Sequence, residues 1–253
     1  MSPLRGFPAP RLPRGPLVAL LVGAAVAGGA AHLAAGRLPT GRALEELAYY
    51  PSGRWLGAAS LGETATLADL TWLRAVQYYG EHRQTDNRFG LLYHVLDIVT
   101  DLDPRHRNSY VFGGTSLAQE GNQFARGLAL LEKGRAADPR EWVYPFEIGF
   151  LHFVQKRDHD TAAKWFREAA RKPDCPPYVA RFAAYSAGRA GHRSAAIELW
   201  QGVAESSDNR LLREKAVAEV RRLARGTPGW PAAQRWALAI EDGAAPPAAG
   251  GGR

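Results

Sequence analysis

Apolar residues recur at helical spacing in the middle of the chain. Between Thr66 and Tyr79 they come at steps of three residues, which predicts one helix with an apolar side. That side comprises Leu67, Leu70, Leu73 and Val76, with Trp72 beside them. Polar residues follow, and a second apolar run covers residues 89–99. Because Pro104 cannot continue a helix and is favoured at the start of the next one, the two runs predict a helix pair that ends there.

The same arrangement then recurs along the chain. Further helix pairs are predicted at residues 108–123 with 124–139, 141–158 with 159–174, and 177–192 with 193–208. Pro104, Pro139 and Pro173 are 35 and 34 residues apart, and a period of 34 indicates stacked helical hairpins. Asp-Pro-Arg precedes two of the new pairs. We interpret it as a joint between hairpins, because no acid or base partner repeats beside Asp103 or Asp138.

At residues 65–208 the chain resembles the tetratricopeptide repeat (TPR) family, whose pattern alternates bulky, small and aromatic residues along each helix pair. The matching residues are Trp72, Tyr79, Leu92, Leu96, Val99 and Pro104 in the first pair; Tyr110, Gly114, Leu117, Gly127, Leu131, Gly134 and Pro139 in the second; Ile148, Gly149, Ala162, Phe166 and Ala169 in the third; and Ala180, Ala183, Ala184, Ala187, Gly191, Ala196, Trp200 and Val203 in the fourth. The resemblance implies an all-α fold, an α-solenoid of about four TPR-like hairpins.

The predicted organisation has five parts. A basic N-terminus with a signal-anchor segment (1–42) and a linker (43–64) precede the repeats, and C-terminal capping helices (209–242) and a disordered tail (243–253) follow them. Stacked hairpins need a final helix with a polar outer side. The apolar side of that helix is expected to comprise Leu211, Leu212, Ala216, Val220 and Leu223. A basic partner-binding helix is the alternative interpretation of the same residues.

The N-terminus carries a candidate membrane segment. Arg5, Arg11 and Arg14 precede an uncharged stretch from Gly15 to Gly36, about the 20 residues that a membrane-spanning helix needs. The arginines would keep this end in the cytoplasm. The sequence therefore favours a single-pass protein of a bacterial inner membrane with a periplasmic C-terminal domain. A cleaved leader that releases the domain into the periplasm is the first alternative, and an Ala/Gly-rich extension the second.

Charge and cysteine content exclude several classes of protein. The net charge of +7 comes largely from residues 1–42, which hold five arginines and no acid. The remainder is nearly neutral and has no basic stripe interleaved with aromatics, so nucleic-acid binding is not expected. The single cysteine, Cys175, rules out an internal disulfide and a multi-cysteine metal site. A hydrophobic content of 46% is enough to bury a core, and the scarcity of β-branched residues favours helices.

No constellation typical of catalysis or metal binding is visible. His82, His94 and His106 lie twelve residues apart, which does not match the spacing of metal ligands. His159 and Asp160 are expected at a helix start, where an acid caps free N–H groups. We therefore expect no cofactor, no metal and no enzymatic activity. The alternative is an enzyme or a small-ligand-binding domain in which irregular segments bring together Trp55, Glu63, His82 and Asp86.

The expected function is protein–protein interaction. In the TPR family the first helices of successive repeats line a groove that holds a segment of a partner, so the resemblance implies a membrane-anchored scaffold in an envelope assembly. The residues expected in this groove are Gln77, Asn108, Val111, Thr115, Phe146, Phe150, Tyr178, Arg181 and Tyr185. Aromatic residues and arginine suit recognition because they offer contact area with few rotatable bonds. The alternative is that about half of them, Phe146 and Phe150 above all, pack between helices instead.

Overall fold

The computed structural model of the chain describes residues 51–243, and within that range every regular element is helical. The predicted all-α fold is therefore confirmed. The helices are α3 (Gly53–Ala59), α4 (Thr64–Gln84), α5 (Leu92–Leu102), α6 (Arg107–Gln119), α7 (Phe124–Ala137), α8 (Val143–Leu151), α9 (His159–Ala170), α10 (Tyr178–Arg189), α11 (Arg193–Ser206), α12 (Arg210–Ala224) and α13 (Trp230–Glu241). A single π-helical turn, η3 (His152–Lys156), extends α8.

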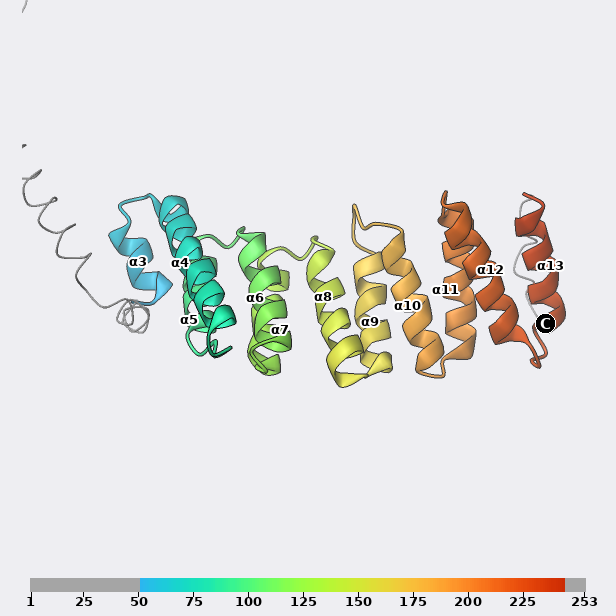
Figure 1. The fold of residues 1–253 in the computed structure, drawn as a ribbon. Helices are drawn as coiled ribbons and strands as arrows, with labels where there is room; N and C mark the ends of the chain where they lie inside the picture. The colour runs from blue at the N-terminus through green and yellow to red at the C-terminus, as the bar shows by residue number, and fades with distance from the viewer. Residues whose placement is uncertain (1–50, 244–253) are drawn as a thin grey trace, which may run out of the picture. The chain divides into compact units, whose positions relative to one another are not determined.

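From α4 onward, helices that follow one another in sequence also pack against one another (Figure 1). The pairs are α4 with α5, α6 with α7, α8 with α9, α10 with α11 and α12 with α13, and each pair contacts the next. Aromatic rings join the first helices of successive pairs, as between Trp72 and Phe112 at 5.4 Å and between Tyr110 and Tyr144 at 5.6 Å. The described domain is therefore held together by contacts between near neighbours in the chain.

The boundaries of the second to fourth pairs follow the predicted ranges closely, but the first pair differs. Helix α4 runs to Gln84, through residues that were expected to interrupt it, and α5 begins only at Leu92. The 43–64 range, predicted as a linker, contains α3. Tyr78 accounts for the longer helix, because its hydroxyl donates to the carbonyl oxygen of Arg88 at 3.3 Å and accepts from the N–H of Leu91 at 3.2 Å. These bonds fasten the α4–α5 connection to α4 itself.

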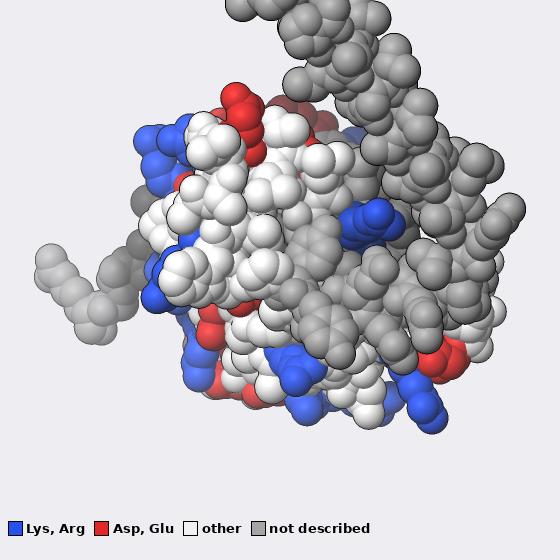
Figure 2. Space-filling view, turned by 90° about the vertical axis from the view of Figure 1, so that its left-hand side faces the viewer, with Lys and Arg blue, Asp and Glu red and all other residues white. Residues whose placement is uncertain are grey.

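The predicted apolar side of α4 was only partly right: Leu67 and Trp72 pack against the core, but its other members are exposed. Leu70, Leu73 and Val76 are 56%, 55% and 38% exposed, whereas the buried side consists of Ala68, Thr71, Ala75 and Tyr78. Alanine and threonine are small, so this side lets α4 approach α5 closely. In Figure 2, which faces the end formed by α3 and α4, the visible described surface is largely uncharged, with charged residues mainly at its edge.

The two Asp-Pro-Arg segments have the same local structure. Asp103 ends α5 and Asp138 ends α7, with nearly equal backbone angles of φ −132°, ψ 95° and φ −133°, ψ 89°. In each, the carboxylate accepts a hydrogen bond from the arginine two residues on, from the N–H of Arg105 at 2.9 Å and of Arg140 at 3.0 Å. Such a turn is typical of aspartate before a new helix. The repetition marks joints between helix pairs, as predicted.

Small residues set the distances between paired helices. A Cβ atom added to Gly114 of α6 would lie 2.5 Å from Cγ of Leu131 in α7, and one added to Gly149 of α8 would lie 3.0 Å from the Phe166 ring in α9. Ala162, Ala184 and Ala196, which match small positions of the family pattern, are all fully buried. Small residues therefore occupy helix contacts at these positions.

The C-terminal helices close the domain differently from the prediction. Helix α12 buries Ala216, Val217, Val220 and Leu223, but Leu211, which was assigned to its apolar side, is exposed. Helix α13 lies within the range 209–242 predicted for capping helices and packs on α12, with Trp236 and Ala237 in the same core. The Nε1–H of Trp236 donates to Glu205 of α11 at 2.8 Å, which fixes its polar edge.

Ion pairs link the second helices of successive pairs. The ammonium group of Lys133 in α7 lies 2.6 Å from Asp97 and 2.5 Å from Asp101 in α5, and the two carboxylates raise its pKa although burial opposes this. Arg135 of α7 lies 3.5 Å from Glu168 of α9. Because these groups are partly exposed, the pairs stabilise the fold only modestly but fix the register of the helices.

No helix in the described range 51–243 is long and apolar enough to cross a membrane. The predicted signal-anchor segment (1–42) and most of the predicted tail (243–253) lie outside the described residues.

We expect Gly114→Ala to destabilise the domain by about 1–3 kcal/mol, because Leu131 and the helices around it must shift to admit a Cβ atom. Gly202→Ala in α11 is the matched control, since a Cβ atom there meets nothing within 4 Å. That change should stabilise by about 0.5–1 kcal/mol through helix propensity. Urea unfolding of both variants measures the difference. Equal effects in the two variants would contradict the role assigned to Gly114.

Candidate partner-binding surface

Four of the nine predicted groove residues lie on α4 and α6, apart from the five on α8 and α10. Gln77 and Asn108 are exposed, and Val111 and Thr115 are half-buried. The hydroxyl of Thr115 donates to the carbonyl oxygen of Val111 at 2.8 Å, so it is used within its own helix. This bond goes to the main chain of Val111 and joins no two side chains of the predicted groove.

The five residues on α8 and α10 belong to a different environment. An aromatic cluster, as we call it below, forms where α8, η3, α9 and α10 meet; its members are Trp142, Phe146, Phe150, Phe153, Phe166, Tyr178, Phe182 and Tyr185. Ring-centroid distances between contacting members are 5.4–6.5 Å, within the range in which aromatic pairs attract one another. Phe146, Phe150, Tyr178 and Tyr185 were predicted, and the structure places them together.

Phe146 lies at the centre of the aromatic cluster. Its ring is 5.5 Å from Phe166 of α9, 6.0 Å from Tyr178 and 5.4 Å from Phe182 of α10. Phe146 and Phe150 pack on the buried residues of this region and are only partly accessible. Their principal role is therefore helix packing, the alternative weighed from the sequence.

The accessible part of the aromatic cluster is formed by α10. Tyr178 and Tyr185 are 41% and 45% exposed, and Arg181 between them is exposed as well. The guanidinium carbon of Arg181 lies 5.4 Å from the centroid of the Phe182 ring. Spacings of three and four residues put these side chains on one side of the helix. We call Tyr178, Arg181 and Tyr185 the aromatic surface.

A π-helical turn contributes to this arrangement. The wider turn of η3 changes the direction of the side chains that follow Leu151, and Phe153 contacts Tyr185 at 5.9 Å and His159 at 5.2 Å. The turn ends at Arg157, whose φ of 52° is left-handed. Turns of this kind occur frequently at functional sites. Here the turn connects the base of the aromatic surface to the start of α9.

Sequence reasoning missed Trp142, Phe153 and Phe182. A signal for two of them was present, because Trp142, Phe146 and Phe150 recur every four residues, and Phe182 follows Tyr178 at the same spacing. This periodicity marks a helix side that packs against a neighbour. Phe153 could not be placed in this way, because η3 departs from the α-helical period.

The residues of the alternative ligand site do not converge. Glu63 precedes the first residue of α4 and His82 lies near its last residue, so the two are about 28 Å apart along the helix axis. His82 instead pairs locally with Asp86 at 2.5 Å, which lowers the pKa of that carboxyl. Trp55 is exposed on α3. The expectation that irregular segments bring these four residues together is incorrect, because α4 is one long helix.

Histidine and acidic side chains near helix starts have structural roles. His106 precedes α6 and accepts from the N–H of Ser109 at 3.3 Å. The start of α9 is capped by Asp158, which accepts from the N–H of Thr161 at 3.0 Å, rather than by Asp160 as expected. Asp160 pairs with Lys164 and with His192. Within residues 51–243, no group of three or more His, Cys, Asp or Glu side chains is arranged to hold a metal ion.

Burial affects two titratable groups near this surface. Glu147 follows Phe146 on α8, and burial raises the pKa of its carboxyl. Cys175 lies between α9 and α10, as expected for the joint between pairs, and burial raises the pKa of its thiol to about 11. A thiol with such a pKa is almost entirely protonated at neutral pH and is therefore a poor nucleophile.

Comparisons with known proteins found no matching family model and no matching curated protein.

We expect Cys175 to react slowly with iodoacetamide in the folded protein. At pH 8 a pKa of about 11 leaves a thiolate fraction of about 0.1%, against roughly a quarter for a free cysteine. Alkylation should therefore be roughly 200-fold slower than in urea-unfolded protein, in proportion to the thiolate fractions. Mass spectrometry of timed samples gives both rates. A native rate close to the unfolded one would show that the thiol is accessible and activated.

Proposed function

We propose that the chain is a non-enzymatic, TPR-like scaffold that binds a segment of a partner protein on the aromatic surface. The observation that carries the proposal is the exposure of Tyr178 and Tyr185 on either side of Arg181, above a rigid aromatic cluster. Monomeric domains bury most of their large aromatic residues, and tyrosine and arginine are enriched where partners bind. A preorganised base limits the entropy lost on binding.

The all-α architecture supports the TPR-like part of the proposal. Successive helix pairs pack in chain order, with joints at Asp103 and Asp138 that repeat one local geometry. Small residues stand at helix contacts where the family pattern has them, as at Gly114 and Gly149. On this basis α10 is the first helix of a repeat, the position from which the family presents partner-binding side chains.

The membrane part of the proposal rests on sequence. Arginines before an uncharged segment of membrane-spanning length favour an inner-membrane anchor with the described domain in the periplasm. The partner would then be a protein of a bacterial envelope assembly. If the N-terminal segment is instead a leader that is cleaved, the domain is released into the periplasm, and the proposed surface and its partner are the same.

Arg181→Glu combined with Tyr185→Ala should weaken binding of the partner at least about tenfold, because it removes an anchor ring and reverses a charge at the centre of the surface. The measurement is affinity capture of the tagged full chain from membranes, with quantitative mass spectrometry. Arg235→Glu with Leu238→Ala, at exposed positions of α13, is the matched control. The two variants should keep the wild-type melting temperature. Partners retained equally by both would rule out the aromatic surface as their binding site.

A reporter enzyme that is active only outside the cytoplasm should be active when fused after Arg253, because the proposed topology sends the C-terminal domain across the membrane. The same fusion lacking residues 1–42 is the control and should be inactive. Activity of a second reporter, one that works only in the cytoplasm, at this position would disprove the envelope location. That result would not bear on the proposed binding surface.

A further inference from the structure

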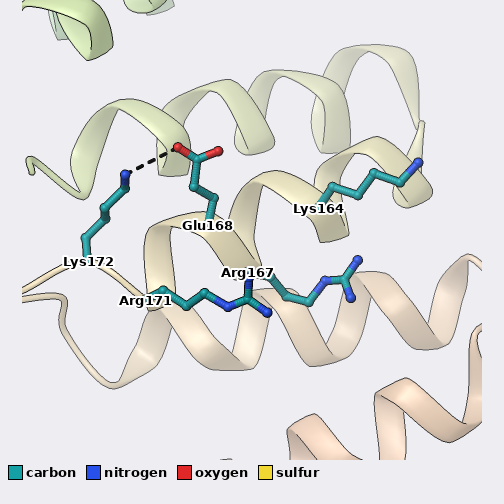
Figure 3. Close-up of a pocket in the computed structure, with 5 residues that line it drawn as sticks. All are labelled: Lys164, Arg167, Glu168, Arg171 and Lys172. Atoms are coloured by element: carbon teal, nitrogen blue, oxygen red, sulfur yellow. Dashed lines mark ion pairs between the residues drawn. The ribbon is translucent and has the colours of Figure 1, made fainter. Parts of the chain in front are cut away.

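Helix α9 has a second, basic side. Ala162, Phe166 and Ala169 are buried in the core, and the helical period puts Lys164, Arg167 and Arg171 on the other side of the helix. A surface pocket of about 480 Å³ opens here (Figure 3). It is lined by Lys164, Arg167, Glu168, Arg171 and Lys172, four cations and one carboxylate. We call it the basic pocket.

The cations of the basic pocket are only partly neutralised. Lys164 pairs with Asp160 at 2.5 Å. The single carboxylate of the pocket, Glu168, is shared at 3.5 Å between Lys172 and Arg135 of α7. Within residues 51–243, neither Arg167 nor Arg171 forms an ion pair with a carboxylate. Two guanidinium groups one helical turn apart therefore face the pocket without a counter-charge.

Both arginines extend from the same side of α9, away from Glu168 and Lys172 (Figure 3). The side chain of Arg167 is held in place by one hydrogen bond, which its Nε–H donates to the carbonyl oxygen of Ala163 at 3.3 Å. The ends of its guanidinium remain available as donors. Guanidinium groups bind carboxylates through two parallel N–H···O bonds, a geometry that lysine cannot offer.

The helix dipole explains part of this charge pattern. Cations near a helix C-terminus are favourable, which applies to Arg167 and Arg171. It does not apply to Lys164, in the first half of α9, which pairs with Asp160 instead. Arg167 and Arg171 are favourably placed near the end of the helix and still have no carboxylate partner among the described residues.

We propose that the basic pocket binds an acidic segment of a polypeptide, with carboxylates on Arg167 and Arg171. Side chains one helical turn apart are about 5–6 Å apart at Cβ, close to the spacing of alternate side chains on an extended peptide. Each guanidinium can hold one carboxylate in a bidentate contact, so two acidic side chains on one segment would use both arginines. Free phosphate is the competing anion that the test below distinguishes. The inference is independent of the aromatic surface, which lies on α10.

The experiment measures binding of a short fluorescein-labelled peptide with glutamate at alternate positions to the full chain in detergent, by fluorescence anisotropy. The same peptide with glutamine is the probe control. Arg167→Gln with Arg171→Gln should weaken binding about tenfold or more, since two bidentate contacts are lost. Arg225→Gln with Arg235→Gln removes the same charge at exposed positions elsewhere and should change affinity less than about twofold.

A third variant gives a change in the opposite direction. Glu168→Gln removes the only carboxylate that lines the pocket and should tighten binding of the acidic peptide several-fold. A purely structural role of the arginines predicts no such gain. Melting temperatures confirm that each variant is folded.

Several results would overturn the inference. The first is that the peptide does not bind, and the second is that the two double-arginine variants lose affinity equally. The third is that inorganic phosphate displaces the peptide at constant ionic strength, which would assign the pocket to phosphate. Tyr185→Ala should leave the affinity of the peptide unchanged; a loss there would place the peptide on the aromatic surface instead. Failure of the aromatic surface to bind its own partner has no bearing on these measurements.

Discussion

The close approach of helices at small residues is the constraint on which the described domain depends. The Leu131 side chain packs against Gly114, the Phe166 ring packs against Gly149, and the Tyr144 ring packs against Gly134. Glycine in a helix costs about 1 kcal/mol relative to alanine. The cost is offset where a bulky neighbour fills the space, because burying a leucine or phenylalanine side chain contributes roughly 1.5–3 kcal/mol. The α6–α7 and α8–α9 pairs therefore each have a glycine opposite a large side chain, and Gly134 provides the same kind of contact between these two pairs.

This constraint also explains which predictions from the sequence succeeded. The period of 34–35 residues and the Asp-Pro-Arg joints reflect local chemistry, namely a proline that cannot continue a helix and an aspartate that closes a turn. Such signals are readable without tertiary information. The bounds of the second to fourth helix pairs were therefore predicted closely, and α12 and α13 lie within the range predicted for capping helices.

The errors arose where side-chain size, rather than hydrophobicity, decides burial. On α4 the leucines were expected to form the core side, but Ala68, Thr71 and Ala75 are buried, whereas Leu70 and Leu73 are exposed. On α10 the family alignment did not indicate Phe182, which contacts Phe146 and Phe166. The distance between Glu63 and His82 depended on the length of α4, which Tyr78 extends through bonds that no periodicity reveals.

Helix α9 shows how one element can supply two surfaces of different chemistry. Its buried side fixes Phe166 beneath the aromatic cluster, and its outer side presents guanidinium groups to a pocket. Because the inner contacts hold the backbone, substitutions on the outer side can alter charge without disturbing the core. A partner with one segment that binds the aromatic surface and a second, acidic segment could contact both surfaces. Once the first segment was bound, the effective concentration of the second segment near the basic pocket would determine the overall affinity of the partner. Two weak sites on the adjacent helices α9 and α10 would in that case reinforce one another.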